Sequence, residues 1–351
     1  MYSPENEQDI VEQDDEQGEL FEHYHFDVDK GQSLLRIDKF LANRIEGISR
    51  SKIQAAADAG NILVNEKSVK SSYKIKPCDV ISIVLPYPKR EFELIAENIP
   101  LKVIYEDDDI LIVNKDPGMV VHPGHGNYTG TLINALLYKF KDLKGFNDGS
   151  ARPGLAHRID KNTSGILVIA KNELSLNKLA RQFADRTIDR KYTAIVWGNF
   201  PEKTGTITGN IGRSLKDKVK MDVFPEGNLG KHAVTHYNVI ENFHYVSVIE
   251  CKLETGRTHQ IRVHLEHVGN PVFNDDRYGG DRIVKGTTFA KYRQFIDNCF
   301  SIIPRHALHA KSLGFIHPTT GKYMHFESEL PDDMAEVIEK WRKYSTSFDS
   351  N

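Results

Sequence analysis

The sequence predicts an α+β protein, in which a mixed, largely antiparallel sheet flanked by helices follows a small α+β domain. Two observations lead to this fold class. Strand-like and helical patterns between residues 101 and 345 do not alternate regularly, which argues against a doubly wound parallel sheet. A separate basic segment nearer the N-terminus has helices and strands of its own. The 351 residues leave room for both domains.

Residues 1–30 form an acidic segment with few apolar side chains. They hold eleven Asp and Glu residues against one lysine, a charge of −10, whereas the whole chain carries −3. Chains of this composition repel themselves and cannot bury a core. We therefore expect a disordered tail without a catalytic role.

The next segment, residues 31–86, has the makeup of a small α+β domain. A helix is expected from Ser33 onward, because apolar residues recur there at helical spacing: Leu35, Ile37, Phe40, Leu41 and Ile45. A second helix begins at Ser49 and ends at Gly60. Two strands, over residues 62–64 and 80–85, complete the domain.

This segment also carries most of the excess positive charge. Between residues 31 and 90, eleven Lys and Arg stand against five acidic residues, a charge of +6. Basic charge concentrated on a small domain indicates binding to a phosphate backbone, although a solvated face is the ordinary alternative. The candidate phosphate-binding side chains are Arg36, Lys39, Arg50, Lys52 and Lys67.

Pro86-Tyr87-Pro88 indicates a stiff linker, which we place at residues 87–100, and the second domain is expected over residues 101–345. Its predicted strands cover residues 101–105, 110–114, 166–170, 192–197, 234–240 and 245–253. Its predicted helices cover residues 131–140, 174–185, 258–268 and 332–344.

Asp160 is the most informative acidic residue of this domain. It lies in the run His157-Arg158-Ile159-Asp160-Lys161-Asn162-Thr163-Ser164-Gly165, directly before the apolar Ile166-Leu167-Val168-Ile169-Ala170. The pattern places an ionised carboxylate on a loop at a sheet edge, where it can do chemistry. The alternative is a turn aspartate satisfied by the backbone of Thr163 and Ser164.

Two resemblances extend this interpretation. Residues 35–84, RIDKFLANRIEGISRSKIQAAADAGNILVNEKSVKSSYKIKPCDVISI and its flanks, resemble the αL RNA-binding motif of small-subunit ribosomal proteins. About residues 101–330 resemble the RluA family of RNA pseudouridine synthases, with its RluD-like members that act on the large ribosomal subunit. The matching segments are YEDDDILIVNKDPGMVVHPG, HRIDKNTSGILVIAK, RKYTAIVWG, ETGRTHQIRVHLEHVGNPV and RHALHAKSLGFIHP.

The resemblance implies the pseudouridine synthase fold and the isomerisation of uridine to its C-glycoside. In that reaction the bond from N1 to the ribose breaks and C5 is joined to C1′, so no cofactor is implied. The resemblance assigns the catalytic carboxylate to Asp160. It acts either as nucleophile at C1′ or as the base that removes the 2′ proton. Because burial beneath a base opposes ionisation, a nearby cation is needed.

Three further roles follow from the resemblance. Arg262 is the cation paired with Asp160; alone it reads equally as an exposed helix arginine. Tyr192 is the aromatic residue whose ring stacks on the target base and whose hydroxyl accepts the C5 proton; alone it reads as a core residue. Arg158 takes the phosphate, or the space vacated in the RNA helix, when the uridine is flipped out.

Two positions depart from the family pattern. Ile159 replaces the commoner leucine, a nearly volume-neutral change. Asn274-Asp275-Asp276 stands where the family more often has Gly-Asp, which leaves the local turn open.

No metal is predicted. The closest histidine pairs, His122 with His125 and His264 with His267, have no cysteine or carboxylate set to complete a shell, and the three cysteines form no CxxC pair. No segment reads as a membrane span or signal peptide, so we expect a cytoplasmic protein.

The expected partner is large-subunit (23S) ribosomal RNA or the assembling large subunit, bound by a monomer. Two alternatives remain at this point: a pseudouridine synthase acting on transfer RNA or another RNA, and a non-catalytic RNA-binding factor of ribosome assembly. The acidic tail could also compete with RNA for the basic domain, although a merely solvating tail is the more ordinary interpretation.

Overall fold

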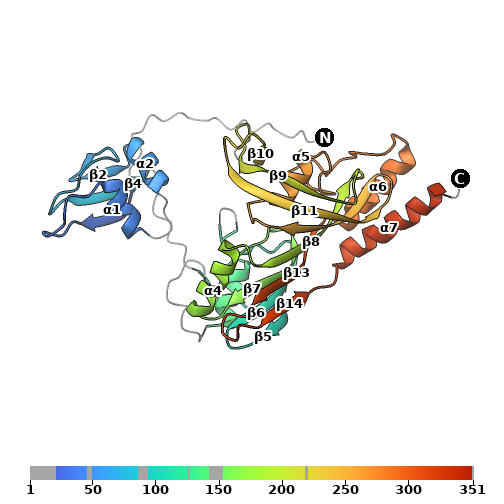
Figure 1. The fold of residues 1–351 in the computed structure, drawn as a ribbon, viewed down its shortest axis with the longest axis horizontal. Helices are drawn as coiled ribbons and strands as arrows, with labels where there is room; N and C mark the ends of the chain where they lie inside the picture. The colour runs from blue at the N-terminus through green and yellow to red at the C-terminus, as the bar shows by residue number, and fades with distance from the viewer. Residues whose placement is uncertain are drawn as a thin grey trace, which may run out of the picture. The chain divides into compact units, whose positions relative to one another are not determined.

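The computed structural model describes residues 21–45, 50–85, 94–124, 127–141, 153–217 and 220–349. The chain divides into two compact units, Met1–Glu93 and Leu94–Asn351 (Figure 1). The boundary differs from the predicted one. Leu94 packs against the core of the larger unit, and the Glu97 N–H donates to the Asn134 carbonyl at 2.9 Å. The predicted linker is therefore wrong for residues 94–100, and its part at 87–93 lies outside the described residues.

The smaller unit packs two helices against an antiparallel sheet of order β1-β4-β2-β3. Its elements are β1 (Phe21–Asp27), α1 (Ile37–Arg44), α2 (Arg50–Asp58), β2 (Ile62–Val64), β3 (Lys67–Ser68) and β4 (Val80–Leu85). Ile37, Phe40 and Leu41 of α1 are buried, as the helical spacing predicted.

β1 corrects the expectation of a disordered tail reaching residue 30. Phe21–Asp27 pairs with β4, and the ring of Phe26 meets that of Phe40 edge-on at 6.4 Å. Glu22, counted among the repelling acids, accepts a hydrogen bond from Ser82 of β4. The prediction from charge alone overlooked Tyr24 and Phe26, two aromatic residues at the alternating spacing typical of a strand. Residues 1–20 of the predicted tail lie outside the described residues.

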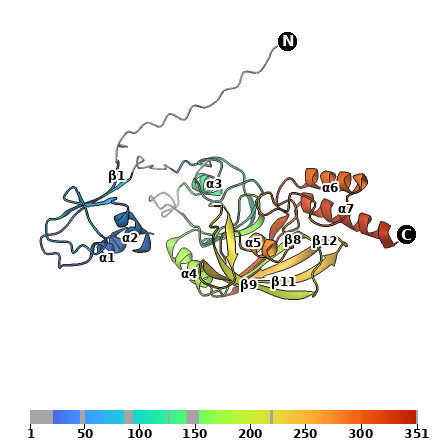
Figure 2. The ribbon, with the colours of Figure 1, turned by 90° about the horizontal axis from the view of Figure 1, so that it is seen from above.

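The larger unit is built on a mixed sheet of order β10-β9-β11-β12-β8-β13-β7-β6-β5, with β14 paired to β13 (Figures 1 and 2). Only β13 and β7 run parallel among the described pairs, so the predicted mixed, largely antiparallel sheet is confirmed. The strands are β5 (Lys102–Glu106), β6 (Ile110–Lys115), β7 (Ser164–Ala170), β8 (Asp189–Trp197), β9 (Thr204–Arg213), β10 (Met221–Phe224), β11 (Lys231–Asn242), β12 (Val246–Leu253), β13 (Leu308–Ile316) and β14 (Tyr323–Glu327). The helices are α3 (Leu132–Lys139), α4 (Glu173–Ala184), α5 (Gln260–His267), α6 (Ala290–Ile302) and α7 (Asp332–Asp349).

Continuous apolar runs in β6 and β7 reflect burial on both faces of the sheet. Leu167 and Ile169 of β7 pack in a core that includes α3, α6 and α7, whereas Ile166 and Val168 pack in a second core with Leu179 of α4. α5 lies against β9, β10 and β11 (Figure 2). Both cores immobilise the start of β7, directly after the Asp160 loop.

β13 was not predicted, although it lies between β7 and β8 at the centre of the sheet. Its run Leu308–Ile316 contains polar residues that mask a strand pattern. His309 is nevertheless buried, with hydrogen bonds to Ser164 Oγ at 2.9 Å and to Ser328 Oγ at 2.8 Å. Tertiary hydrogen bonds thus make a polar sequence suitable for a central strand. β9, β10, α6 and β14 were also absent from the prediction.

Candidate active site

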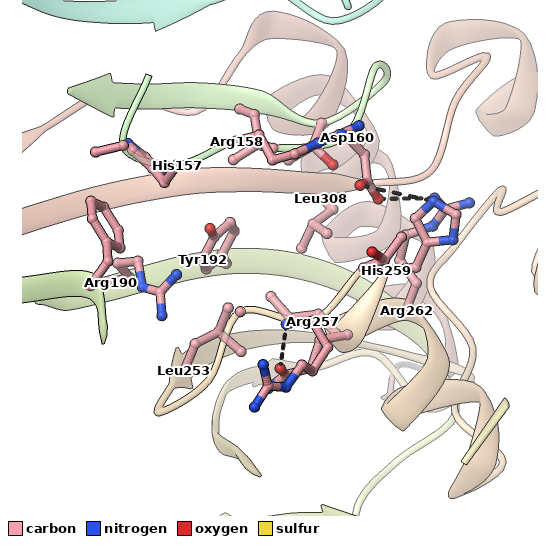
Figure 3. A pocket seen from close by; sticks show the side chains of 18 of the residues that line it. His157, Arg158, Asp160, Arg190, Tyr192, Leu253, Arg257, His259, Arg262 and Leu308 are labelled. Carbon is pink, nitrogen blue, oxygen red and sulfur yellow. Dashed lines mark hydrogen bonds and ion pairs between the residues drawn. The ribbon is translucent and has the colours of Figure 1, made fainter. Parts of the chain in front are cut away.

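A pocket of about 360 Å³ opens where four segments of the larger unit meet (Figure 3). They are the loop before β7 with Asp160, strand β8 with Tyr192, the turn from β12 into α5 with Arg262, and Leu308 at the start of β13. The sheet order β12-β8-β13-β7 places these segments side by side. Three candidate residues separated widely in sequence therefore line one cavity.

Arg262 bridges two carboxylates. Its Nη1 donates to Asp160 Oδ2 at 3.0 Å, and its Nε and Nη2 donate to the two oxygens of Asp275 at 2.6 and 2.8 Å. Arg262 is only 4% exposed, and Asp275 is fully buried. The bidentate pair with Asp275 orients the guanidinium, because its planar fork matches a carboxylate. The third nitrogen, Nη1, then donates to Asp160.

The turn at Asn274-Asp275, left open by the sequence, has a clear structure. Asn274 adopts a left-handed φ of 54°, a conformation that asparagine tolerates better than most residues with a side chain. Its amide donates to the Ile303 carbonyl at 2.6 Å. Asp275 Oδ1 also accepts the backbone N–H groups of Arg277 and Tyr278 at 3.1 Å. Asparagine here supports the turn that holds the partner of Arg262.

Asp160 is ionised in this setting. Burial raises the pKa of its carboxyl, but the nearby His259, when protonated, and Arg262 oppose burial and hold the pKa below its usual value. His259 lies 4.0 Å from Asp160 and hydrogen-bonds Tyr278. Burial has the opposite effect on His259 and lowers its pKa, so the imidazole is neutral at neutral pH. Arg262 is therefore the charge that keeps Asp160 ionised there.

Tyr192 lies in the pocket on strand β8, between Arg190 and Asp160 in Figure 3. Its side chain is buried, and burial raises the pKa of the phenol, so that the hydroxyl is protonated at neutral pH. The hydroxyl makes no hydrogen bond to any described residue, which leaves it available to a ligand.

Buried side chains fix the backbone on the C-terminal side of Asp160. Lys115 is buried and donates to three carbonyls, one of which is that of Lys161 at 2.9 Å. Thr163 Oγ1 hydrogen-bonds the buried His306 at 2.8 Å. Gly165 has a φ of 116°, and a Cβ there would lie 2.2 Å from the Ala310 carbonyl oxygen. Only glycine fits opposite Ala310 in this parallel pairing of β7 with β13.

Further cations line the pocket. Arg158 is exposed, in the wall shared by the pocket and a neighbouring hollow of about 610 Å³. Arg257 donates to the His232 carbonyl at 3.1 Å, and Arg190 is buried beside Phe183. Sequence reasoning missed Arg190 and Asp275. Arg190 could have been found from its spacing, because residues two apart on a strand share a face and Tyr192 was already a candidate.

The candidates in the smaller unit fall into two groups. Arg36 and Arg50 both donate to the buried Asp38, Arg36 through two hydrogen bonds of 3.0 and 3.1 Å. Burial raises the pKa of Asp38, but these partners outweigh it and hold the carboxyl ionised. Both arginines therefore help to hold α1 against α2, while their side chains remain partly exposed at the surface. Lys39, Lys52 and Lys67 are exposed.

One group of potential metal ligands occurs among the described residues. Asp107, Asp109 and His317 bring ligand atoms within 4.8 Å of one another. The carboxylates of the two aspartates already accept hydrogen bonds. Asp107 Oδ1 accepts from two backbone N–H groups at 2.9 Å, and Asp109 Oδ1 accepts from Asn172 at 2.9 Å. None of the three lines the pocket. The arrangement reads as a hydrogen-bonded turn.

Comparison with known proteins agrees with this geometry. The sequence profile of the family RNA pseudouridylate synthase matches residues 109–267, and that of the S4 domain matches residues 35–81. A Chlorobaculum parvum protein named as an uncharacterized RNA pseudouridine synthase is 47% identical over 92% of this chain and 99% of its own length. A Zymomonas mobilis protein named ribosomal large subunit pseudouridine synthase D is 40% identical over 85% of this chain and 91% of its own length.

A solved structure supports the fold. The human protein named RNA Pseudouridylate Synthase Domain Containing 4 superposes with a TM-score of 0.51 and 22% identity, covering 68% of this chain and 92% of that one. Among the described helices, none combines the length and apolar character that a membrane crossing requires. The chain belongs to the RluA family of RNA pseudouridine synthases and carries an S4 domain ahead of its catalytic domain.

Proposed function

We propose that this enzyme isomerises specific uridines of large-subunit ribosomal RNA to pseudouridine, with Asp160 as the catalytic carboxylate. The observation that carries the proposal is the Arg262–Asp160 contact of 3.0 Å at the wall of a 360 Å³ pocket. A cavity near the lower end of the range for ligand sites accepts one nucleotide and excludes a stacked helix. The target uridine must therefore be flipped into it, at an unstacking cost of a few kcal/mol.

Asp160 acts on the ribose. As a nucleophile it attacks C1′, and as a base it removes the 2′ proton; both roles need the ionised form that Arg262 maintains. The N1–C1′ bond breaks, the base turns, and the C5–C1′ bond forms. The proton lost from C5 is balanced by the proton gained at N1, so no external reagent is consumed.

Tyr192 stacks on the base and relays the C5 proton. Because its phenol is neutral, it takes up this proton only while passing its own to water. Arg158, exposed beside the pocket, contacts the phosphate or the vacated helical space of the RNA. The S4 domain binds structured RNA through Arg36, Lys39, Arg50, Lys52 and Lys67.

The choice of ribosomal RNA is supported by relatives. Proteins of Zymomonas mobilis, Nitrosomonas europaea and Neisseria meningitidis that are 38–40% identical to this chain bear the name ribosomal large subunit pseudouridine synthase D. We further propose action in the cytoplasm, where the subunit is assembled, and action as a monomer, since one chain supplies Asp160, Tyr192 and Arg262.

The test is pseudouridine mapping in a strain that lacks the gene and is complemented by variants. Wild type should restore the missing pseudouridines of large-subunit RNA, whereas D160N should not. The matched control is D116N, which changes a half-exposed aspartate paired with Lys102; it should restore them fully. Restoration by D160N would refute the catalytic assignment. Loss of pseudouridine only from transfer RNA would refute the choice of RNA.

A further inference from the structure

Arg190 is a buried cation without an anionic partner. It is 9% exposed, its Nε is inaccessible and lacks a hydrogen-bond partner, and within the described chain the residue forms no ion pair. Its described neighbours on β8 differ. Asp189 pairs with Lys252 at 2.9 Å and Lys191 pairs with Glu250 at 3.3 Å, on the opposite face of the strand.

An unpaired buried charge is costly, because desolvation is not offset by a counter-charge. Arg190 contacts the face of the Phe183 ring at 5.3 Å, a cation–π contact worth far less than an ion pair. A Cβ at Gly256 would lie only 3.0 Å from Nη1, so the glycine makes space for the guanidinium in the pocket wall, which both residues line. These features indicate a ligand that completes the site.

The position of Arg190 narrows the choice of ligand atom. Figure 3 shows Arg190 and Asp160 toward opposite ends of the pocket, with Tyr192 between them. The charges of Arg190 and Asp160 both act on the phenol of Tyr192, in opposite directions. A base stacked on Tyr192, with its ribose C1′ at Asp160, therefore extends its far edge toward Arg190. In uridine the carbonyl on that edge is C4=O4.

We propose that Arg190 reads the far carbonyl of the flipped base, donating to O4 of uridine in the substrate and to O2 of pseudouridine in the product. The inference rests on the proposed role of Asp160. When the N1–C1′ bond breaks with its electron pair left on the base, the negative charge spreads onto O2 and O4. The guanidinium stabilises this charge where it develops.

The same donor serves both orientations of the base. A half-turn about the line through N3 and C6 exchanges N1 with C5 and O2 with O4. After the turn, C5 bonds to C1′, loses its proton, and N1 is protonated, while Arg190 still faces a carbonyl oxygen. Cytosine presents an amino group at the same place, so two donors would meet and leave each other unsatisfied. Arg190 thus determines specificity for uracil.

The experiment combines a protein change with a base change. Full-length enzyme is assayed in single turnover on a ribosomal RNA fragment whose target position is uridine or 4-thiouridine, sulfur being the weaker acceptor. R190M should slow uridine turnover by about 10–100-fold, the effect of losing a hydrogen bond to a charged group. The Kd for the fragment should stay within about twofold. In wild type the sulfur should slow the reaction, and in R190M it should make no further difference.

Controls separate this role from others. K191M changes the neighbouring residue on the opposite face and should keep the wild-type rate. R190M should unfold at or above the wild-type temperature, because it removes an unpaired buried charge; a lower unfolding temperature would indicate a structural role and overturn the proposal. Weaker RNA binding, with a salt-dependence slope reduced by about 1 and an unchanged rate at saturation, would make Arg190 a phosphate ligand and also overturn it.

The two proposals fail separately. Turnover of the uridine fragment by wild type, lost in D160N, tests the catalytic assignment of Asp160. The Arg190 proposal is judged on the coupling between R190M and 4-thiouridine. If the effects of the two changes multiply independently, Arg190 does not contact O4.

Discussion

Replacement of Arg262 by methionine is expected to affect stability and catalysis through two different carboxylates. Arg262 is 4% exposed, and its guanidinium donates to both Asp275 and Asp160. R262M leaves Asp275 buried with only backbone N–H donors. Breaking one partner of a buried pair costs about 3–5 kcal/mol. At about 2–4 °C per kcal/mol for a domain of this size, the unfolding temperature should fall by roughly 10 °C.

The pH dependence reports on Asp160. Its pKa is raised by burial and lowered by Arg262, and the lowering wins in the wild type. Without Arg262 the effect of burial is opposed less, so the pKa of the Asp160 carboxyl should rise. Since the ionised form is active, activity is lost as the pH falls through this pKa. The acid limb of the single-turnover rate should therefore move to higher pH in R262M.

The double variant R262M/D275N separates the two effects. The amide side chain introduced by D275N carries no charge, and its oxygen can still accept the two backbone N–H groups that Asp275 Oδ1 accepts. The unfolding temperature of the double variant should regain much of what R262M loses. The acid limb of its single-turnover rate should stay at the raised pH of R262M. An R262M enzyme whose acid limb coincides with that of wild type would refute the reasoning about Asp160. Failure of D275N to restore stability would refute the reasoning about the buried pair.

G165A should destabilise the catalytic domain in urea far more than G118A, because Gly118 shares a left-handed φ but faces open space and should cost only about 1–2 kcal/mol; equal losses would contradict this. D38N should lower the stability of the S4 domain, because it removes the buried carboxylate shared by two arginines. In the full-length protein, proteolysis should become faster within the S4 domain and stay unchanged in the catalytic domain. Unchanged proteolysis would show that the pair contributes little. Deletion of residues 1–20, with eight acidic and no basic residues, should raise nonspecific RNA affinity at low salt; the deletion stops before β1, so the sheet is kept. An unchanged affinity would indicate a merely solvating tail.

Apolar patterns were sufficient to predict a helix or strand wherever the apolar side chains of that element are the ones buried in the core. The apolar runs of β6 and β7 and the stripe of α1 predicted elements that the structure contains. The patterns failed to predict an element where charged or polar residues are accommodated by contacts with residues distant in the sequence. β1 carries acidic residues whose charge suggested disorder, yet it pairs with β4. β13 carries a histidine and a lysine whose polar atoms are satisfied by hydrogen bonds to distant serines.

The family, the order of the motifs and the residue types of the site could all be predicted from the amino-acid sequence, because each motif keeps its residues together in a short segment of chain. How these residues act together depends on contacts that form when the chain folds. Asp160 and Arg262 lie 102 positions apart and meet because the sheet brings their loops to one pocket. The second partner of Arg262, Asp275, and the unpaired charge of Arg190 are properties of burial, and burial depends on the whole fold rather than on neighbouring residues.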